Sequence, residues 1–153
     1  MPRFKSSNPE HQRYEDAVRI HQAVGGLEIA TGNDGTNTVE IPSCPAVLVS
    51  MDVMPGGLVG DTFDLYVQTR LNATSGWFDV VHFNQVLGNV GVTVLQHTVI
   101  SPVAVAEPMF LTSAALAAGA ERHIMGLDWR TRWEIVNAGA ASFYFNAWLT
   151  PMG

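Results

Sequence analysis

Two alternating runs near the C-terminus decide the fold of this chain: Asp128-Trp-Arg-Thr-Arg-Trp-Glu-Ile-Val-Asn137 and Ser142-Phe-Tyr-Phe-Asn-Ala-Trp148. One face of the first run is aromatic or β-branched: Trp129, Thr131, Trp133 and Ile135. One face of the second is apolar: Phe143, Phe145, Ala147 and Leu149. A period of two with such side chains is typical of half-buried antiparallel strands. Residues 138–141 form a short Gly/Ala turn, so we expect the two strands to make a hairpin.

Four further strands are expected upstream, at residues 46–54, 61–71, 77–86 and 93–103. The first is apolar almost throughout, which is typical of a strand in the middle of a sheet. The second and third are joined by a tight connection at 72–76, which predicts a hairpin. Residues 27–30 and 38–41 flank a turn-rich loop and are expected to form another hairpin.

A short strand at 108–111 brings the expected total to about eight. The alanine-rich segment 113–120 is long enough for a turn or two of helix, and no helix is long enough to connect parallel strands. We therefore predict an all-β fold, an antiparallel β-sandwich that resembles a jelly roll.

The 153 residues suffice for one domain. Half of the eight basic residues lie in the first 19 positions, which sets the start of the chain apart. We divide the chain into an extended N-terminal arm, residues 1–16, and a single β-sandwich domain, residues 17–153. Two interpretations of the arm stay open: a floppy tail, or a docking segment in which Arg3, Phe4 and Lys5 contact a neighbouring subunit.

Charge and cysteine content limit the partners of the domain. Beyond position 19 the chain has 11 acidic and four basic residues, so we expect no direct binding to nucleic acid. Cys44 is the only cysteine, which leaves no partner for an intrachain disulfide and is compatible with a reducing cytoplasm. We find neither the pattern of a signal peptide nor a long apolar run, so we expect no membrane association.

No pattern of catalytic residues is visible. The five histidines lack metal-ligand spacing, and neither a serine nor Cys44 has a nucleophile motif around it. His82 is expected to be a sheet histidine with one hydrogen bond. We therefore predict that the chain is not an enzyme and uses neither a cofactor nor a metal ion.

Two groups of oxygen-bearing side chains could have a chemical role instead of a structural one. Asp64 and Asp79 are expected on adjacent strands, where paired carboxylates could serve glycoside hydrolysis, but we favour an ion pair of Asp64 with Arg70. Four residues of the 31–40 segment could surround a calcium ion: Asn33, Asp34, Asn37 and Glu40. Because the EF-hand spacing is absent, we expect these residues to serve a tight turn.

The outward face of the terminal hairpin is the candidate contact surface. It would bring together residue types that anchor protein interfaces: Arg130, Arg132, Tyr144 and Trp148. The alternative is that Glu134 and Asp128 neutralise the two arginines within the sandwich. Both interpretations stay open.

Several segments resemble small β-sandwich virion proteins of tailed bacteriophages. Asp64-Leu-Tyr-Val-Gln-Thr-Arg-Leu71, Gly76-Trp77 and Phe78-Asp-Val-Val-His-Phe-Asn-Gln-Val86 are similar to a hairpin of that family. Arg130-Thr-Arg-Trp133 and Ser142-Phe-Tyr-Phe145 are similar to its C-terminal strands. The likeness covers residues 61–88 and 122–149, and the turn at 72–76 departs from the Asp/Gly-rich turn that is usual there.

The resemblance implies a non-enzymatic structural role in the virion, after assembly in the host cytoplasm. It implies a capsid decoration (cement) protein that binds the major capsid protein as a homo-oligomer and stabilises the phage head, or else a neck or tail accessory protein. A carbohydrate-binding or adhesin module is the alternative, with Trp77, Tyr144 and Trp148 as stacking platforms.

If the arm is a docking segment, deletion of residues 1–13 weakens binding to the particle and leaves the domain folded, because multivalent attachment loses one of its contacts. Co-sedimentation with purified particles measures the binding, and circular dichroism measures the fold. Equal binding by the truncated and full-length proteins would exclude a docking role for the arm.

Overall fold

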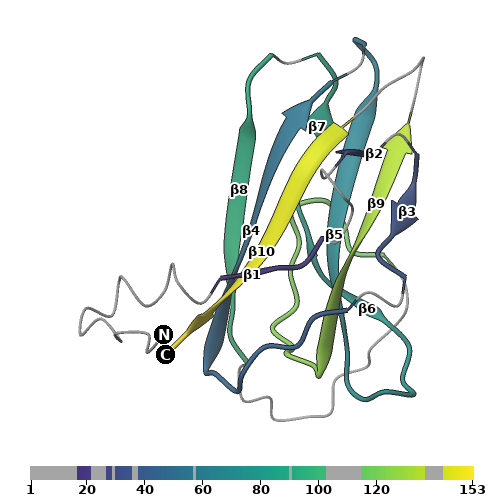
Figure 1. The fold of residues 1–153 in the computed structure, drawn as a ribbon. Coiled ribbons are helices and arrows are strands. Elements are labelled where there is room, and N and C mark those ends of the chain that lie inside the picture. The colour runs from purple at the N-terminus through teal and green to yellow at the C-terminus, as the bar shows by residue number, and fades with distance from the viewer. Residues whose placement is uncertain are drawn as a thin grey trace, which may run out of the picture.

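Two antiparallel β-sheets packed face to face make up this protein, which confirms the predicted all-β sandwich (Figure 1). The computed structural model describes residues 17–21, 27–28, 30–35, 38–56, 58–89, 91–102, 115–136 and 143–153. The predicted arm, residues 1–16, and the predicted strand at 108–111 lie outside this part of the chain. Within it, no helix has the length and apolar character needed to cross a membrane.

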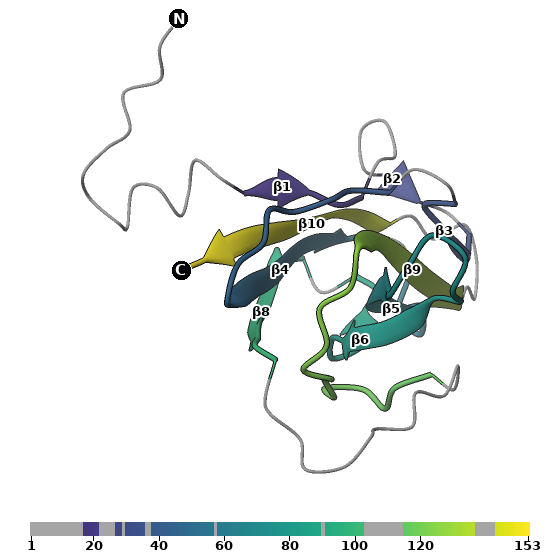
Figure 2. The same ribbon diagram turned by 90° about the horizontal axis from the view of Figure 1, so that it is seen from below.

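Each sheet has five strands. Sheet A has the order β1–β10–β4–β8, with β2 also paired to β10: β1 (Val18–Arg19), β10 (Phe143–Met152), β4 (Ala46–Pro55), β8 (Val94–Ile100) and β2 (Leu27–Glu28). Sheet B has the order β3–β9–β5–β6, with β7 also paired to β5: β3 (Gly32–Asn33), β9 (Asp128–Val136), β5 (Thr62–Arg70), β6 (Phe78–His82) and β7 (Val86–Leu87). Figure 2 shows the two layers from the end.

The longest strands form the middle of each sheet. β4 pairs with β10 along its whole length and with β8 on its other side, so the apolar run 46–54 lies inside sheet A as predicted. β5 pairs with β9 along its whole length and with β6 in the predicted hairpin. In the hairpin turn, the Asn72 carboxamide oxygen accepts hydrogen bonds from the backbone N–H groups of Thr74 and Ser75.

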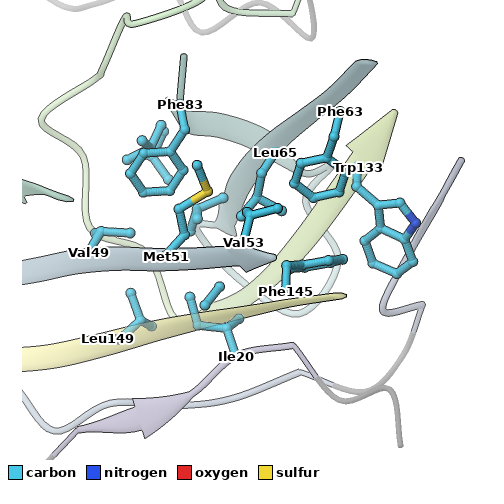
Figure 3. Close-up of a cluster of buried hydrophobic side chains, with 14 of the residues drawn as sticks. Ile20, Val49, Met51, Val53, Phe63, Leu65, Phe83, Trp133, Phe145 and Leu149 are labelled. Atoms are coloured by element: carbon cyan, nitrogen blue, oxygen red, sulfur yellow. The ribbon is translucent and has the colours of Figure 1, made fainter. Parts of the chain in front are cut away.

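The hydrophobic core lies between the two sheets, where alternate residues of every long strand point inward (Figure 3). Phe145 of sheet A contacts two rings of sheet B: its centroid lies 4.9 Å from that of Phe63 and 5.4 Å from that of Trp133. Phe63 also stacks on Phe143 at 5.2 Å. Each such pair is worth about 0.5–1.5 kcal/mol beyond the burial of its area, so these aromatic rings hold the sheets together.

The expected hairpin of the two C-terminal strands is wrong. β9 pairs with β5 and β3 in sheet B, whereas β10 pairs with β4, β1 and β2 in sheet A. Their inward faces therefore meet across the core. The alternation along a strand shows which of its faces is buried. It does not show whether the next strand in the chain lies beside it in the same sheet or opposite it in the facing sheet, because both arrangements bury the same face.

The expected hairpin around residues 31–37 is also wrong, because the chain changes sheets there. β2 pairs with β10 in sheet A, and β3 pairs with β9 in sheet B. Asp34, expected to serve a tight turn, is buried, and one carboxylate oxygen accepts hydrogen bonds from the backbone N–H and hydroxyl of Thr131, at 2.7 and 2.5 Å. Its other oxygen lies 3.0 Å from Nδ1 of His21, a fully buried ring stacked on Phe145. Asp34 thus ties the segment after β1 to sheet B.

The described part of the alanine-rich segment, residues 115–120, contains a turn and no helix. It lies along the edge of β6, where the Gly119 N–H donates to the His82 carbonyl and the His82 N–H donates to the Ala120 carbonyl. Hydrogen bonding to a strand edge replaces the helical bonds that alanine propensity favours.

Truncation of Phe145 tests the core. Phe145→Ala removes a fully buried ring that contacts both Phe63 and Trp133, so we expect the free energy of unfolding to fall by about 3–5 kcal/mol. Tyr144→Ala is the matched control on the same strand, because its side chain is exposed, and its cost should stay below about 1 kcal/mol. Urea denaturation of both variants measures the difference, and equal losses would contradict the inward orientation of Phe145.

Candidate interaction surfaces

The outer face of sheet B is a dense layer of charged residues. Alternate positions of β5, β6 and β9 point away from the core and carry these side chains: Asp64, Arg70, Asp79, Asp128, Arg130, Arg132 and Glu134. Most of these groups are bonded to one another or to neighbouring polar residues. The layer forms two clusters, one around Trp77 and one around Tyr66.

Two guanidinium groups lie over the ring of Trp77. The Arg130 carbon Cζ is 4.4 Å from the ring centroid, and that of Arg70 is 5.0 Å away. Arg70 also donates to the Asp128 carboxylate through Nε at 2.6 Å, and Arg130 donates to the Gln68 side chain at 2.9 Å. Burial lowers the pKa of Arg130 below its ordinary value, although the charge of Asp34 opposes this. Both arginines are therefore held by groups of their own chain.

The second cluster is centred on the Tyr66 ring. The guanidinium of Arg132 lies 3.6 Å from the ring centroid, bonds to Glu134, and lies 3.2 Å from the Asp79 carboxylate. Burial opposes the charge of Arg132, but the bonds and charges of Glu134 and Asp79 outweigh it and raise its pKa. Burial, followed by the charge of Glu134, raises the pKa of Tyr66. The cluster buries a tyrosine on a face that would otherwise be open to water.

His82, expected to be a sheet histidine, lies at the end of β6 and belongs to the same cluster. Its ring stacks on Tyr66 at 3.9 Å. Its Nδ1 lies 2.8 Å from the Leu116 carbonyl and its Nε2 lies 3.0 Å from the Asp64 carboxylate. Both ring nitrogens thus face oxygen acceptors, which fixes the ring between β5 and the 115–120 segment.

The expected ion pair of Asp64 with Arg70 is also wrong. Arg70 lies opposite Asp128 in the β5–β9 register and pairs with it at 2.5 Å. Asp64 lies six residues earlier on the same strand, a separation of roughly 20 Å at the rise of a β-strand. Residues that share a face of one strand are too far apart to pair at this spacing, so the partner comes from the neighbouring strand.

The carboxylates considered for catalysis are occupied by structural partners. Asp64 and Asp79 lie on the adjacent strands β5 and β6, as expected. Asp64 accepts from His82 and Gln85, and Asp79 accepts from Gln68 at 2.8 Å. In the described part of the chain, no three His, Cys, Asp or Glu side chains are placed to hold a metal ion. Asp64 and Asp79 thus connect neighbouring strands through these bonds.

The outer face of sheet A has the opposite character. Four apolar or aromatic side chains on it are well exposed: Leu95 (75%), Met54 (60%), Tyr144 (41%) and Val99 (40%). On the described strands β1, β4, β8 and β10, Asp52 is the only carboxylate and Arg19 the only cation on this side. Asp52 is held by the backbone N–H and the carboxamide of Asn146, at 3.2 and 2.9 Å. This face is largely neutral and apolar.

The predicted contact residues do not form one surface. Arg130 and Arg132 lie on the outer face of sheet B, whereas Tyr144 and Trp148 lie on the outer face of sheet A. The reason is the separation of β9 and β10 into different sheets. The alternative in which Glu134 neutralises an arginine holds for Arg132, while Asp128 pairs with Arg70 instead. The arm residues Arg3, Phe4 and Lys5 lie outside the described residues.

The sequence did not lead us to predict several residues of these faces: Met54, Leu95, Val99 and Tyr66. It also did not predict that Trp77 contacts two arginines. A signal was present for β8, because Leu95 and Val99 alternate with the polar Gln96 and Thr98. In the structure Leu95 and Val99 point outward, and the polar pair bonds to Asn84 and Glu121 across the opening between the sheets.

Two hollows accompany the sheets. One of about 150 Å³ lies between β8 and the 119–121 segment, and its wall includes His82, Gln96 and Glu121. The other, of about 310 Å³, is lined by Ile41, Pro42, Ser43, Cys44, Pro102, Met125 and Gly126. None of the described residues that line the second hollow could act as a general base to the Cys44 thiol.

No protein-family model, curated protein or solved structure matches this chain. The contrast between its two outer faces is therefore the basis for a functional proposal.

Burial of Tyr66 predicts a loss of stability at alkaline pH. The folded state holds the phenol proton above the ordinary pKa of 10.0, whereas the unfolded state releases it there. The contribution is fully present below pH 10 and is lost as the pH rises through the folded-state pKa. Tyr66→Phe should make this alkaline fall shallower, and Tyr144→Phe should not. Urea denaturation across this pH range measures it, and an unchanged fall in Tyr66→Phe would contradict the prediction.

Proposed function

We propose that this protein is a non-catalytic structural protein of a phage virion that docks on other virion proteins through the outer face of sheet A. Its role is that of a capsid decoration protein, which binds the major capsid protein and stabilises the head. The observation that supports it is the exposed apolar group Met54, Leu95, Val99 and Tyr144 on a face that is nearly free of charge.

An exposed sheet face of this composition favours contact with another protein. The open face of an antiparallel sheet is usually polar, because one face packs on the core and the other meets water. Contiguous apolar side chains on such a face are typical of an interaction site. Met54 and Tyr144 are directly opposite in the β4–β10 register, and Leu95 is paired to β4 at Asp52, so these residues lie on neighbouring strands. Docking would remove them from water together.

The outer face of sheet B has a different role in the proposal. Its guanidinium groups lie over aromatic rings and are bonded to carboxylates at Arg70 and Arg132 and to the Gln68 amide at Arg130, so little of their hydrogen-bonding capacity is left for a partner. Such a layer crosslinks β5, β6 and β9. We propose that this layer makes the sandwich rigid and so maintains the shape of the docking face. Arg130 and Arg132 are therefore not proposed as primary contacts.

The resemblance to small β-sandwich virion proteins supports the same role. A virion lattice presents many copies of one binding site, so a homo-oligomer with a modest apolar contact per subunit gains affinity by avidity. The arm residues Arg3, Phe4 and Lys5 are proposed as a second contact to a neighbouring subunit. Binding to a neck or tail protein is the alternative within this class and follows from the same face.

The carbohydrate-binding alternative receives less support. Trp77, one of its three platforms, lies against two guanidinium groups instead of standing open. Trp148 is only partly exposed, which leaves Tyr144 as the exposed ring on that face. One exposed ring among aliphatic side chains suits a protein surface better than a sugar.

A charge on the docking face tests the proposal. Met54→Asp places a carboxylate in the apolar group, so the affinity for capsids assembled from the major capsid protein of the same genome should fall at least about tenfold, or ~1.4 kcal/mol. Val136→Asp is the matched control, because Val136 lies on the outer face of sheet B with 62% exposure, close to the 60% of Met54. Its affinity should stay unchanged.

Co-sedimentation of purified protein with these capsids measures both affinities, and isolated tails measure the neck or tail alternative. Tryptophan fluorescence with polysaccharides measures the sugar alternative. The docking proposal fails if Val136→Asp weakens binding as much as Met54→Asp, and the virion role fails if the wild-type protein binds neither capsids nor tails.

A further inference from the structure

Among the strands that the structure describes, β8 is at the edge of sheet A, with β4 on one side and no described strand on the other (Figure 1). The hydrogen bonding of the sheet shows which backbone groups face the open side. The Ala147 carbonyl of β10 accepts a hydrogen bond from the Ile20 N–H, so the backbone groups of Ala147 point away from β4. The backbone groups of the adjacent Trp148 and Asn146 therefore point toward β4. In an antiparallel sheet the facing direction alternates along each strand.

The same alternation continues across β4 to β8. The backbone groups of Ser50 and Asp52 point toward β10, where these residues pair with Trp148 and Asn146. The backbone groups of Met51 therefore point toward β8 and bond to Gln96. On β8 the N–H and C=O groups that face the open side therefore belong to Leu95, His97 and Val99. Within the described residues, none of these three makes a backbone hydrogen bond on that side. The edge offers three donors and three acceptors.

The usual protection of an open edge is absent from β8. Soluble proteins protect such edges with lysine, proline, a bulge or a very short strand. β8 has seven residues, contains no charged residue, proline or glycine, and its register with β4 is regular. Its exposed side chains include Leu95 and Val99, at positions where a protected edge strand usually has a charged residue. An edge with these properties is suited to a partner strand.

The edge is complementary to itself. In an antiparallel pair of two β8 strands centred on His97, Leu95 of one copy lies opposite Val99 of the other, and His97 lies opposite His97. This register pairs all three outward-facing residues of each strand, whereas a shift by two residues leaves one unpaired. The chain has a net charge of −6, but β8 itself contains no carboxylate, so pairing along this strand brings no acidic side chains of β8 together.

We propose that two copies of this chain pair through β8, antiparallel and centred on His97, so that their A sheets join into one. The two-fold axis of such a pair is perpendicular to the sheet, so both outer faces of sheet A point the same way. The apolar groups around Met54 and Leu95 then form one continuous docking face. This inference deepens the proposed function by defining its homo-oligomer, but the argument for the edge does not depend on the capsid.

The acids near the edge are already bonded. Glu121 bonds to Thr98 and lies 3.2 Å from His123. Asp52, opposite Leu95 on β4, is held by Asn146. These bonds hold both carboxylates against partners within their own subunit.

A charge swap at the two-fold axis tests the dimer in the free protein. Light scattering after size-exclusion chromatography should give the wild-type protein twice the chain mass. His97→Lys and His97→Glu each place like charges opposite one another, so each variant alone should be monomeric. A mixture of the two should recover the dimer, because opposite charges then meet. Val136→Lys and Val136→Glu are the matched controls on sheet B, and both should remain dimeric.

A crosslink tests the register independently of dimer affinity. The Cα atoms of a directly hydrogen-bonded antiparallel pair lie about 5.5 Å apart, within the range of a disulfide. His97→Cys in a Cys44→Ser background should form a covalent dimer on mild oxidation, and Tyr144→Cys in the same background should not. A monomeric wild-type protein that does not crosslink through position 97 would overturn the proposal, as would a dimer that both charged His97 variants retain. Capsid binding by Met54→Asp is measured separately, so failure here leaves the docking proposal standing.

Discussion

The packing of Phe145 against Phe63 and Trp133 is the contact on which the rest of the structure depends. It joins sheet A to sheet B, and it exists because β9 and β10 lie opposite one another across the core. The outward face of each strand then belongs to a different surface of the molecule. Charged side chains of β9 are directed to one surface, and Tyr144 and Trp148 of β10 are directed to the other.

This separation explains the contrast between the two surfaces. On sheet B, Arg70, Arg130 and Arg132 contact carboxylates, an amide and aromatic rings, so all three guanidinium groups have partners within the chain. Sheet A has almost no charge to neutralise, and Met54 and Leu95 stay open to water. The charged groups of one surface thus have partners within the chain, whereas apolar side chains of the other surface are exposed to water. The open edge of β8 borders that second surface.

The sequence allowed the strands and their buried faces to be predicted, but not the partner of each strand. Alternation at Trp129 and Phe143 correctly showed which side faces the core, because burial depends on the strand itself. Pairing depends on residues far away in the chain, so two of the three expected hairpins were wrong. For the same reason Asp64 was expected as the partner of Arg70, whereas the structure places Asp128 there. Asp34 looked like a turn residue because its burial requires Thr131, which is distant in sequence. The apolar docking group could not be predicted for the same reason, since it combines residues of three strands.

Side-chain oxidation of the protein free and bound to capsids tests the central claim most directly, because it reports on both outer faces in one experiment. Met54 and Tyr144 are exposed on sheet A, and Trp77 marks the charged layer of sheet B. We expect binding to protect Met54 and Tyr144 from oxidation and to leave the rate at Trp77 unchanged. Protection of Trp77 with unchanged rates at Met54 and Tyr144 would show that the charged face makes the contact and would contradict this account.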